Sequence, residues 1–132
     1  MDLEILNIAS DTDNNRNLKN HTHFSKLKNS LCGDEIMIKL IIKDDKIVDF
    51  GYQGNSCIYC QASASLLSKI SINTKKSKLN KLCDDAKLYF DDNFIIIEKN
   101  CLILKKLLRK KNISRKNCIL LPFKTLKKIV SN

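Results

Sequence analysis

Apolar and polar residues alternate over two neighbouring stretches of the chain. The first stretch is Glu35–Lys43, rich in Ile, and the second covers residues 46–53. Alternation with a period of two is the pattern of a half-buried strand. Asp44 and Asp45 separate the two stretches and are residues that suit a tight turn. Together these stretches predict an antiparallel β-hairpin.

From Ile58 onward the apolar period lengthens to that of an α-helix. Ala62, Leu66 and Ile70 lie four residues apart, which places them on one buried helical face. The same spacing predicts three later helices: residues 79–90, extended or restarted around 95–97; residues 102–108; and residues 119–130.

The N-terminal region divides into a short apolar-periodic piece, residues 3–8, and a polar stretch, residues 10–28. We expect a short helix followed by a flexible loop, in which His21 and His23 are solvated rather than a metal-ligand pair. The order helix, hairpin, helices predicts an α+β fold with helices packed on one face of a small antiparallel sheet. We expect a single domain over residues 1–132.

The composition is that of an ordinary globular protein. The chain has 132 residues, 43% of them hydrophobic, with 3 Gly and 1 Pro. This excludes collagen-like, proline-rich and disordered classes. It is also too short for a multidomain enzyme with a separate cofactor module.

The formal net charge of +10 raises the question of a nucleic-acid partner. The basic residues are 21 Lys but only 3 Arg, there is no Trp, and aromatic residues are 6%. Phosphate and base recognition favours Arg, and base stacking needs aromatic rings. We attribute much of the charge to the A/T-rich codons that Lys shares with Ile and Asn. A zinc-stabilised nucleic-acid-binding module that uses residues 105–111 remains the alternative.

No apolar run approaches the roughly 20 residues that cross a bilayer. The N-terminus has neither the basic nor the apolar region of a signal peptide. We therefore expect a cytoplasmic protein without a membrane partner. In a reducing compartment, six cysteines indicate metal binding, reactivity or core packing rather than disulfides.

Three cysteines stand at the boundaries of the predicted elements. Cys32 directly precedes the first predicted strand, Cys57 begins the first long helix, and Cys118 precedes the last helix. A helix N-terminus lowers the pKa of a thiol, which favours a nucleophile or a metal ligand. In Cys32-Gly33-Asp34, extended backbone would project the thiol and the carboxylate to the same side, and Gly33 would allow both to bend onto one ion. Three thiolates and one carboxylate suffice for tetrahedral zinc, and three partly buried thiols are the simpler interpretation.

Three motifs in this order resemble a known family. They are Cys32-Gly33-Asp34; residues 54–57 (Gly-Asn-Ser-Cys) followed by Ala-Ser-Ala-Ser at 62–65; and residues 115–126 (Arg-Lys-Asn-Cys-Ile-Leu-Leu-Pro-Phe-Lys-Thr-Leu). In combination they resemble the iron-sulfur cluster assembly scaffold family, the IscU and NifU N-terminal domain type. The chain is most similar to the SufU branch, because Asn117 stands where the IscU branch has a His ligand and because Arg115 matches the SufU pattern.

The resemblance implies a metal site of Cys32, Asp34, Cys57 and Cys118 that holds a zinc ion or an iron-sulfur cluster. It also implies that Cys118 accepts sulfur from a pyridoxal-phosphate cysteine desulfurase of the SufS type, and that Arg115 helps to hold the thiolate or its persulfide. Downstream iron-sulfur assembly proteins would be further partners. Such a chain is an accessory protein rather than an enzyme with a substrate of its own.

The chain departs from the SufU pattern at Cys60, where that branch has Ser. Cys57 and Cys60 therefore form a CxxC sequence, which alone suggests a redox pair or a zinc knuckle. We expect Cys60 to be a small packed thiol, with a second ligand or a resolving cysteine as the alternatives. Cys83 lies in a helical pattern, Cys101 directly precedes Leu102, and both are expected to be core thiols.

Overall fold

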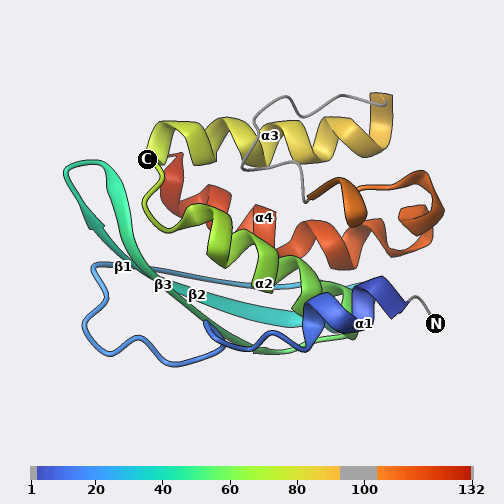
Figure 1. Ribbon diagram of the computed structural model, residues 1–132, viewed down its shortest axis with the longest axis horizontal. Helices are drawn as coiled ribbons and strands as arrows, with labels where there is room; N and C mark the ends of the chain where they lie inside the picture. The colour runs from blue at the N-terminus through green and yellow to red at the C-terminus, as the bar shows by residue number, and fades with distance from the viewer. Residues whose placement is uncertain (1–2, 93–103, 132) are drawn as a thin grey trace.

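The computed structural model describes residues 3–92 and 104–131 as one antiparallel sheet with helices packed on it (Figure 1). The elements in chain order are α1 (Leu3–Ala9), β1 (His23–Lys28), β2 (Glu35–Lys43), β3 (Lys46–Asn55), α2 (Ile58–Ser71), α3 (Lys76–Asp92), the 3₁₀ helix η2 (Lys110–Arg115) and α4 (Lys116–Val130). The sheet order is β1-β2-β3, with both pairs antiparallel. This confirms the predicted α+β class.

The helices form two layers over one face of the sheet. α2 and α4 pack side by side against the strands, and α3 packs on α4 (Figure 1). The core between these layers is apolar and includes Phe50, Leu67 and Phe123, each of which is almost fully buried. None of the described helices is long and apolar enough to cross a membrane.

The predicted hairpin is confirmed with its turn at the expected residues. Asp44 and Asp45 both have positive φ, 53° and 62°, which a two-residue turn between twisted strands requires. Asp is one of the few residues that adopts this conformation readily. The side chains of Ile36, Ile38 and Leu40 on β2 face the helices and are buried.

The prediction of a loop over the whole of residues 10–28 is wrong at its C-terminal end, because residues 23–28 form strand β1. β1 pairs with β2 along its full length, from His23 opposite Leu40 to Lys28 opposite Glu35. Only Ser25 and Leu27 point inward, and Ser25 is polar. The hydrophobic pattern of this edge strand is therefore too weak to reveal it, and pairing with β2 provides its hydrogen bonds.

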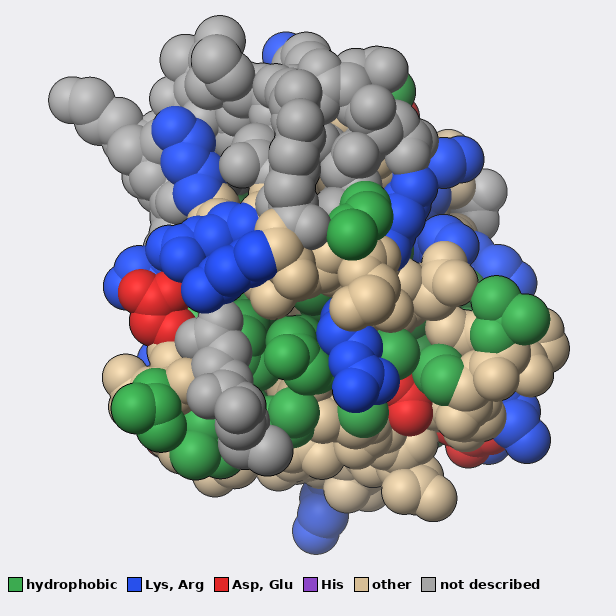
Figure 2. All heavy atoms as spheres, turned by 90° about the vertical axis from the view of Figure 1, so that its right-hand side faces the viewer, with side chains coloured by type: hydrophobic (Ala, Val, Ile, Leu, Met, Phe, Trp, Pro, Cys, Tyr) green, Lys and Arg blue, Asp and Glu red, His purple; other side chains and the backbone are tan. Residues whose placement is uncertain are grey.

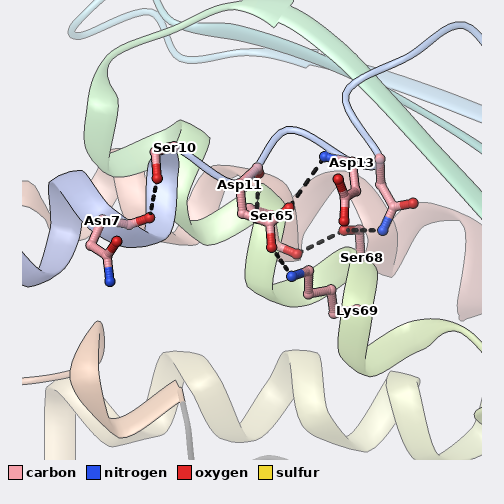
Figure 3. Close-up of polar contacts among 8 residues, drawn as sticks. Asn7, Ser10, Asp11, Asp13, Ser65, Ser68 and Lys69 are labelled. Carbon is pink, nitrogen blue, oxygen red and sulfur yellow. Dashed lines mark hydrogen bonds and ion pairs between the residues drawn. The ribbon is translucent and has the colours of Figure 1, made fainter.

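The remainder of that stretch is tied to helix α2 by polar contacts (Figure 3). Ser65 donates a hydrogen bond from Oγ to the carbonyl oxygen of Asp11, at 2.9 Å, and Lys69 forms an ion pair with the Asp11 carboxylate. Asn14 donates from its side-chain amide to Ser68 Oγ at 2.9 Å. Serines on α2 thus hold the connection between α1 and the sheet.

The C-terminal helices differ from the predictions in two places. Within residues 102–108, the described part contains a 3₁₀ turn at 104–106 rather than an α-helix, while residues 95–97 and Cys101 lie outside the described residues. Helix α4 begins at Lys116, three residues before its predicted start, so Cys118 lies inside its first turn rather than ahead of it. The rest of the predicted helix over 119–130 is confirmed.

Gly54, near the end of β3, is expected to be sensitive to substitution. A Cβ added there would lie 2.1 Å from the Glu35 carbonyl oxygen and 2.9 Å from the Ile36 Cα, both backbone atoms of the paired strand. Because that strand cannot yield without loss of register, we expect Gly54→Ala to lower the free energy of unfolding by about 3 kcal/mol. Urea denaturation followed by circular dichroism measures it.

Gly33→Ala is the matched control for this prediction. Gly33 has a φ of +78°, but no atom lies within 4 Å of an added Cβ, so only backbone strain of about 1 kcal/mol opposes the change. An equal loss of stability in the two variants would contradict the steric argument at Gly54.

Candidate metal centre

Three parts of the chain that carry cysteines meet at one end of the molecule. Cys32 lies in the turn between β1 and β2, Cys57 is the N-cap residue of α2, and Cys118 lies in the first turn of α4. In Figure 1, α2 and α4 both begin at the right-hand end, next to α1. The fold therefore brings together the cysteines that stand at element boundaries.

The turn that carries Cys32 is closed by backbone hydrogen bonds. Gly33 N–H donates to the Asn29 carbonyl oxygen at 2.8 Å, and Asn29 N–H donates to the Asp34 carbonyl oxygen at 2.7 Å. Gly33 has a φ of +78°, the left-handed region in which glycine is unstrained. One expectation is corrected: Cys32 lies between two strands rather than before the first. The bend that Gly33 is expected to allow is present, as a left-handed φ between Cys32 and Asp34.

The donor atoms of Cys32, Asp34 and Cys118 all lie within 4.8 Å of one another. The Cys118 thiol donates a hydrogen bond to Cys32 Sγ, with 3.8 Å between the two sulfur atoms. A tetrahedral ion with metal–sulfur bonds of about 2.3 Å has sulfur–sulfur edges of about 3.8 Å. The two sulfurs are therefore spaced as two ligands of one metal ion.

The Asp34 carboxylate is buried, and only one of its two oxygens has a hydrogen-bond partner among the described residues. Its Oδ1 accepts a hydrogen bond from the Cys57 backbone N–H at 3.1 Å, whereas its Oδ2 is buried and has no hydrogen-bond partner among the described residues. The residue is only 7% exposed. A buried carboxylate oxygen without a partner is costly, and a cation beside it would remove that cost. This unpaired oxygen and the sulfur spacing both fit a metal ion.

Cys57 stands beside the group of three donor atoms. Its backbone holds Asp34, and its thiol interacts with Cys118. Its sulfur does not belong to the set of three donor atoms that lie within 4.8 Å of one another. The structure thus assembles three of the four predicted ligands closely and places the fourth at their edge.

Burial raises the pKa of the Cys118 thiol above its usual range, and the neighbouring Cys57 and Cys32 thiols raise it further. The position of Cys118 at the start of a helix leads to the opposite expectation, a lowered pKa. The helix dipole acts on Cys118, but loss of solvent outweighs it because the residue is only 6% exposed. A cation in the site would be needed to keep this sulfur as a thiolate.

Arg115 links the beginnings of α2 and α4. It is the N-cap residue of α4, and its guanidinium carbon lies 5.3 Å from the centre of the Tyr59 ring. A guanidinium at this distance from an aromatic ring makes a cation–π contact. Arg115 is exposed, so its charge is available at the surface three residues before Cys118. The sequence motifs point to Arg115 but not to Tyr59, whose position two residues after Cys57 is its one local signal.

The other cysteines described by the structure are packed thiols. Cys60 is fully buried, and burial is the main cause that raises its pKa to about 12. Burial likewise raises the pKa of Cys83 to about 12. Both are free thiols, as is Cys57, so the CxxC sequence is not a disulfide in this structure. The predictions of packed thiols at Cys60 and Cys83 are confirmed.

The two histidines stay on the surface, as the sequence predicts. His21 and His23 are exposed, and neither belongs to the group of possible metal ligands found among the described residues. One ring nitrogen of each lies at hydrogen-bond distance from a neighbour: the Leu18 carbonyl oxygen for His21, at 3.1 Å, and Thr22 Oγ1 for His23, at 2.7 Å.

Comparisons with known proteins show the family of the chain. The sequence model of one protein family, the NifU-like N terminal domain, matches residues 4–86 of this chain. The chain is 31% identical over 125 residues to the iron-sulfur cluster assembly scaffold protein IscU of Thermotoga maritima, which covers 93% of this chain and 87% of that protein. It is also 34% identical to the IscU protein of Streptococcus pyogenes over 59 residues, 45% of this chain and 37% of that protein.

Two solved structures share the fold. One is an iron-sulfur cluster assembly scaffold protein for the SUF system from Fervidobacterium islandicum, with a TM-score of 0.88 and 24% sequence identity. The superposition covers 98% of this chain and 96% of that protein's chain. The other is the N-terminal part of a NifU-like protein from Brucella abortus, with a TM-score of 0.89 and 20% sequence identity; this superposition covers 98% of this chain and 91% of that one. At these identities the superpositions establish the architecture alone.

Proposed function

The chain belongs to the NifU-like N-terminal domain family, and from this membership we propose that it is an iron-sulfur cluster assembly protein that binds metal and accepts sulfur. The observation that carries the proposal is the group formed by Cys32, Asp34 and Cys118, with donor atoms within 4.8 Å and one buried carboxylate oxygen unpaired. Relatives named as scaffold proteins support it. Nothing in the comparisons supports the nucleic-acid-binding alternative.

Cys32, Asp34 and Cys118 would hold the metal, and Cys57 would complete the set of four ligands. Three thiolates and one carboxylate suit zinc or an iron-sulfur cluster, since both favour sulfur donors. When bound, the cation supplies the charge that keeps buried thiolates deprotonated. The carboxylate is the hardest of the four donors, so Asp34 would be the ligand that exchanges most readily.

We assign sulfur acceptance to Cys118. The Cys118 sulfur would attack the outer sulfur of a persulfide on a pyridoxal-phosphate cysteine desulfurase, so that Cys118 becomes a persulfide and the desulfurase cysteine is released as a thiol. Two features of the site bear on this step. Cys118 is only 6% exposed, so its turn must open, and Pro122 lacks the N–H that would otherwise bond to the Cys118 carbonyl. This missing bond loosens the turn that has to move.

The end of the molecule that carries the site is also the end where a partner would bind. Figure 2 views this end, where apolar side chains gather with basic and acidic ones. Leu31, next to Cys32, is 82% exposed, and Ile113, in η2, is 50% exposed. Leu3 and Leu6 on α1 are exposed as well. An apolar surface around a buried thiol suits a protein partner, and the desulfurase is the one we propose.

Metal content tests the proposal directly. The chain is purified without oxygen, and zinc, iron and acid-labile sulfide are measured per chain. About one zinc without sulfide would indicate a sulfur relay protected by zinc, and iron with matching sulfide would indicate a cluster scaffold. A chain that contains no metal, and binds none when zinc or iron is added, would contradict the proposed site.

Arg115 and Tyr59 are predicted to act as a pair in sulfur transfer. If Tyr59 holds the guanidinium near Cys118, Tyr59→Leu should raise the KM for the persulfide-carrying desulfurase about two- to fivefold, the size of an exposed cation–π contact. Tyr59→Phe keeps an aromatic ring and should behave like the wild type. Steady-state kinetics of desulfurase stimulation measure both variants.

The double variant separates this pairing from a structural role of Tyr59. In an Arg115→Gln background, Tyr59→Leu should have no further effect on KM, because the charge that the ring holds is already absent. An unchanged effect of Tyr59→Leu in that background would show that the ring acts independently of Arg115.

A further inference from the structure

The contact between Cys118 and Cys32 joins two thiols of very different accessibility. Their sulfurs are 3.8 Å apart although the residues are 86 positions apart in the sequence. Cys118 is buried, whereas Cys32 is exposed in the turn between β1 and β2. A sulfur atom received by Cys118 would therefore be shielded from solvent but would lie next to a second thiol.

Sulfur that arrives as a persulfide is two electrons more oxidised than sulfide. A cluster contains sulfide, so its assembly needs a two-electron reduction of every sulfur atom delivered. We propose that Cys32 is the resolving thiol of this protein: it attacks the Cys118 persulfide and releases the delivered sulfur as sulfide. This inference rests on the proposed role of Cys118 as sulfur acceptor, and it adds a sulfide-releasing activity to that role.

The step balances within the site. Cys32 sulfur bonds to the inner sulfur of the Cys118 persulfide, the sulfur–sulfur bond of the persulfide breaks, and the outer sulfur leaves with the electron pair of that bond. The Cys32 thiol proton goes to the leaving sulfur, so that Cys118–S–SH and Cys32–SH become a Cys32–Cys118 disulfide and H₂S. The two cysteines are oxidised, and the delivered sulfur is reduced. An external dithiol reductant then restores both thiols, and it can reach the disulfide because Cys32 is exposed.

The turn that carries Cys32 has room to make this bond. The two sulfurs must approach from 3.8 Å to about 2.05 Å for a disulfide. Gly33, next to Cys32, has no atom within 4 Å of the position that a Cβ would occupy, so the turn is not packed against other atoms at this residue. Cys57 is held more firmly, because it caps α2 and its backbone N–H is bound to Asp34. Cys32 is therefore the better placed of the two neighbouring thiols.

Both thiols are occupied while they hold a metal, so the activity is expected of the metal-free chain. The 132-residue chain is treated with a chelator and incubated without oxygen and without added thiol. It is mixed with an equimolar amount of the cysteine desulfurase that it stimulates, which has been loaded with persulfide by L-cysteine and then separated from the remaining L-cysteine by gel filtration. Released sulfide is quantified, and peptide mapping by mass spectrometry reports the state of Cys118 and Cys32. Cys32→Ser and, as the matched control, Cys83→Ala are compared with the wild type.

The wild-type chain should release about one sulfide per chain and accumulate the Cys32–Cys118 disulfide. Cys32→Ser should still receive sulfur, but the persulfide should remain on Cys118 and sulfide release should be slower by on the order of tenfold or more. Cys83→Ala, on α3 outside the site, should retain release. Wild-type release from Cys32→Ser, or a Cys57–Cys118 disulfide in place of the Cys32–Cys118 disulfide in the wild-type chain, would overturn the assignment of Cys32. Absence of sulfur on Cys118 in every chain would overturn the proposed function, and this proposal with it.

Discussion

Replacement of Cys118 by Ser is expected to abolish stimulation of the cysteine desulfurase. Cys118 lies in the first turn of α4 at the centre of the site, with Cys32 at 3.8 Å and Cys57 beside it. A serine hydroxyl at this position cannot accept a sulfane sulfur, so the variant cannot carry out sulfur acceptance. We expect the rate of alanine formation from L-cysteine, which measures the stimulation, to fall to the rate of the desulfurase alone.

The control for Cys118→Ser is Cys83→Ala. Cys83 is also buried, but it lies on α3 outside the group of possible metal ligands. Its replacement should leave stimulation intact even if stability falls. Circular dichroism of Cys118→Ser should match the wild type, which separates loss of the nucleophile from loss of the fold. Full stimulation by a folded Cys118→Ser chain would remove Cys118 from the proposed role.

Asp34→Asn is expected to weaken metal binding without lowering the stability of the metal-free chain. The substitution keeps an Oδ1 acceptor for the Cys57 N–H, but it removes the negative charge next to the proposed metal. We expect metal affinity to fall on the order of 100-fold, measured by competition with a chromophoric zinc chelator. Without metal, Asp34 buries a carboxylate with one unpaired oxygen, so loss of its charge should leave the stability unchanged or higher.

Asp34→Ala and Asp49→Asn complete this test. Asp34→Ala removes the acceptor of the Cys57 N–H as well, so it should weaken metal binding and also lower the stability of the metal-free chain by about 1–3 kcal/mol. Asp49 pairs with Arg16 outside the site, so its replacement by Asn should not change metal affinity. Unchanged affinity in both Asp34 variants would exclude Asp34 as a ligand.

The sequence alone determines the elements whose signals are local. Period-two alternation locates β2 and β3, and the two aspartates between them locate the turn, because side-chain direction and turn conformation depend on residues close in sequence. The four-residue spacing locates α2 in the same way. The motifs around Cys32, Cys57 and Cys118 likewise identify the family, which the comparisons confirm.

The tertiary structure decides what depends on contacts between distant residues. β1 exists as a strand because β2 pairs with it, although its own apolar pattern is weak. The spacing of Cys32 and Cys118, the unpaired oxygen of Asp34 and the contact of Arg115 with Tyr59 all arise where separate elements pack together. Burial, which also follows from packing, reverses the expected direction of the Cys118 pKa. Solvent exclusion and distances across the fold are properties of packed elements, and no local pattern contains them.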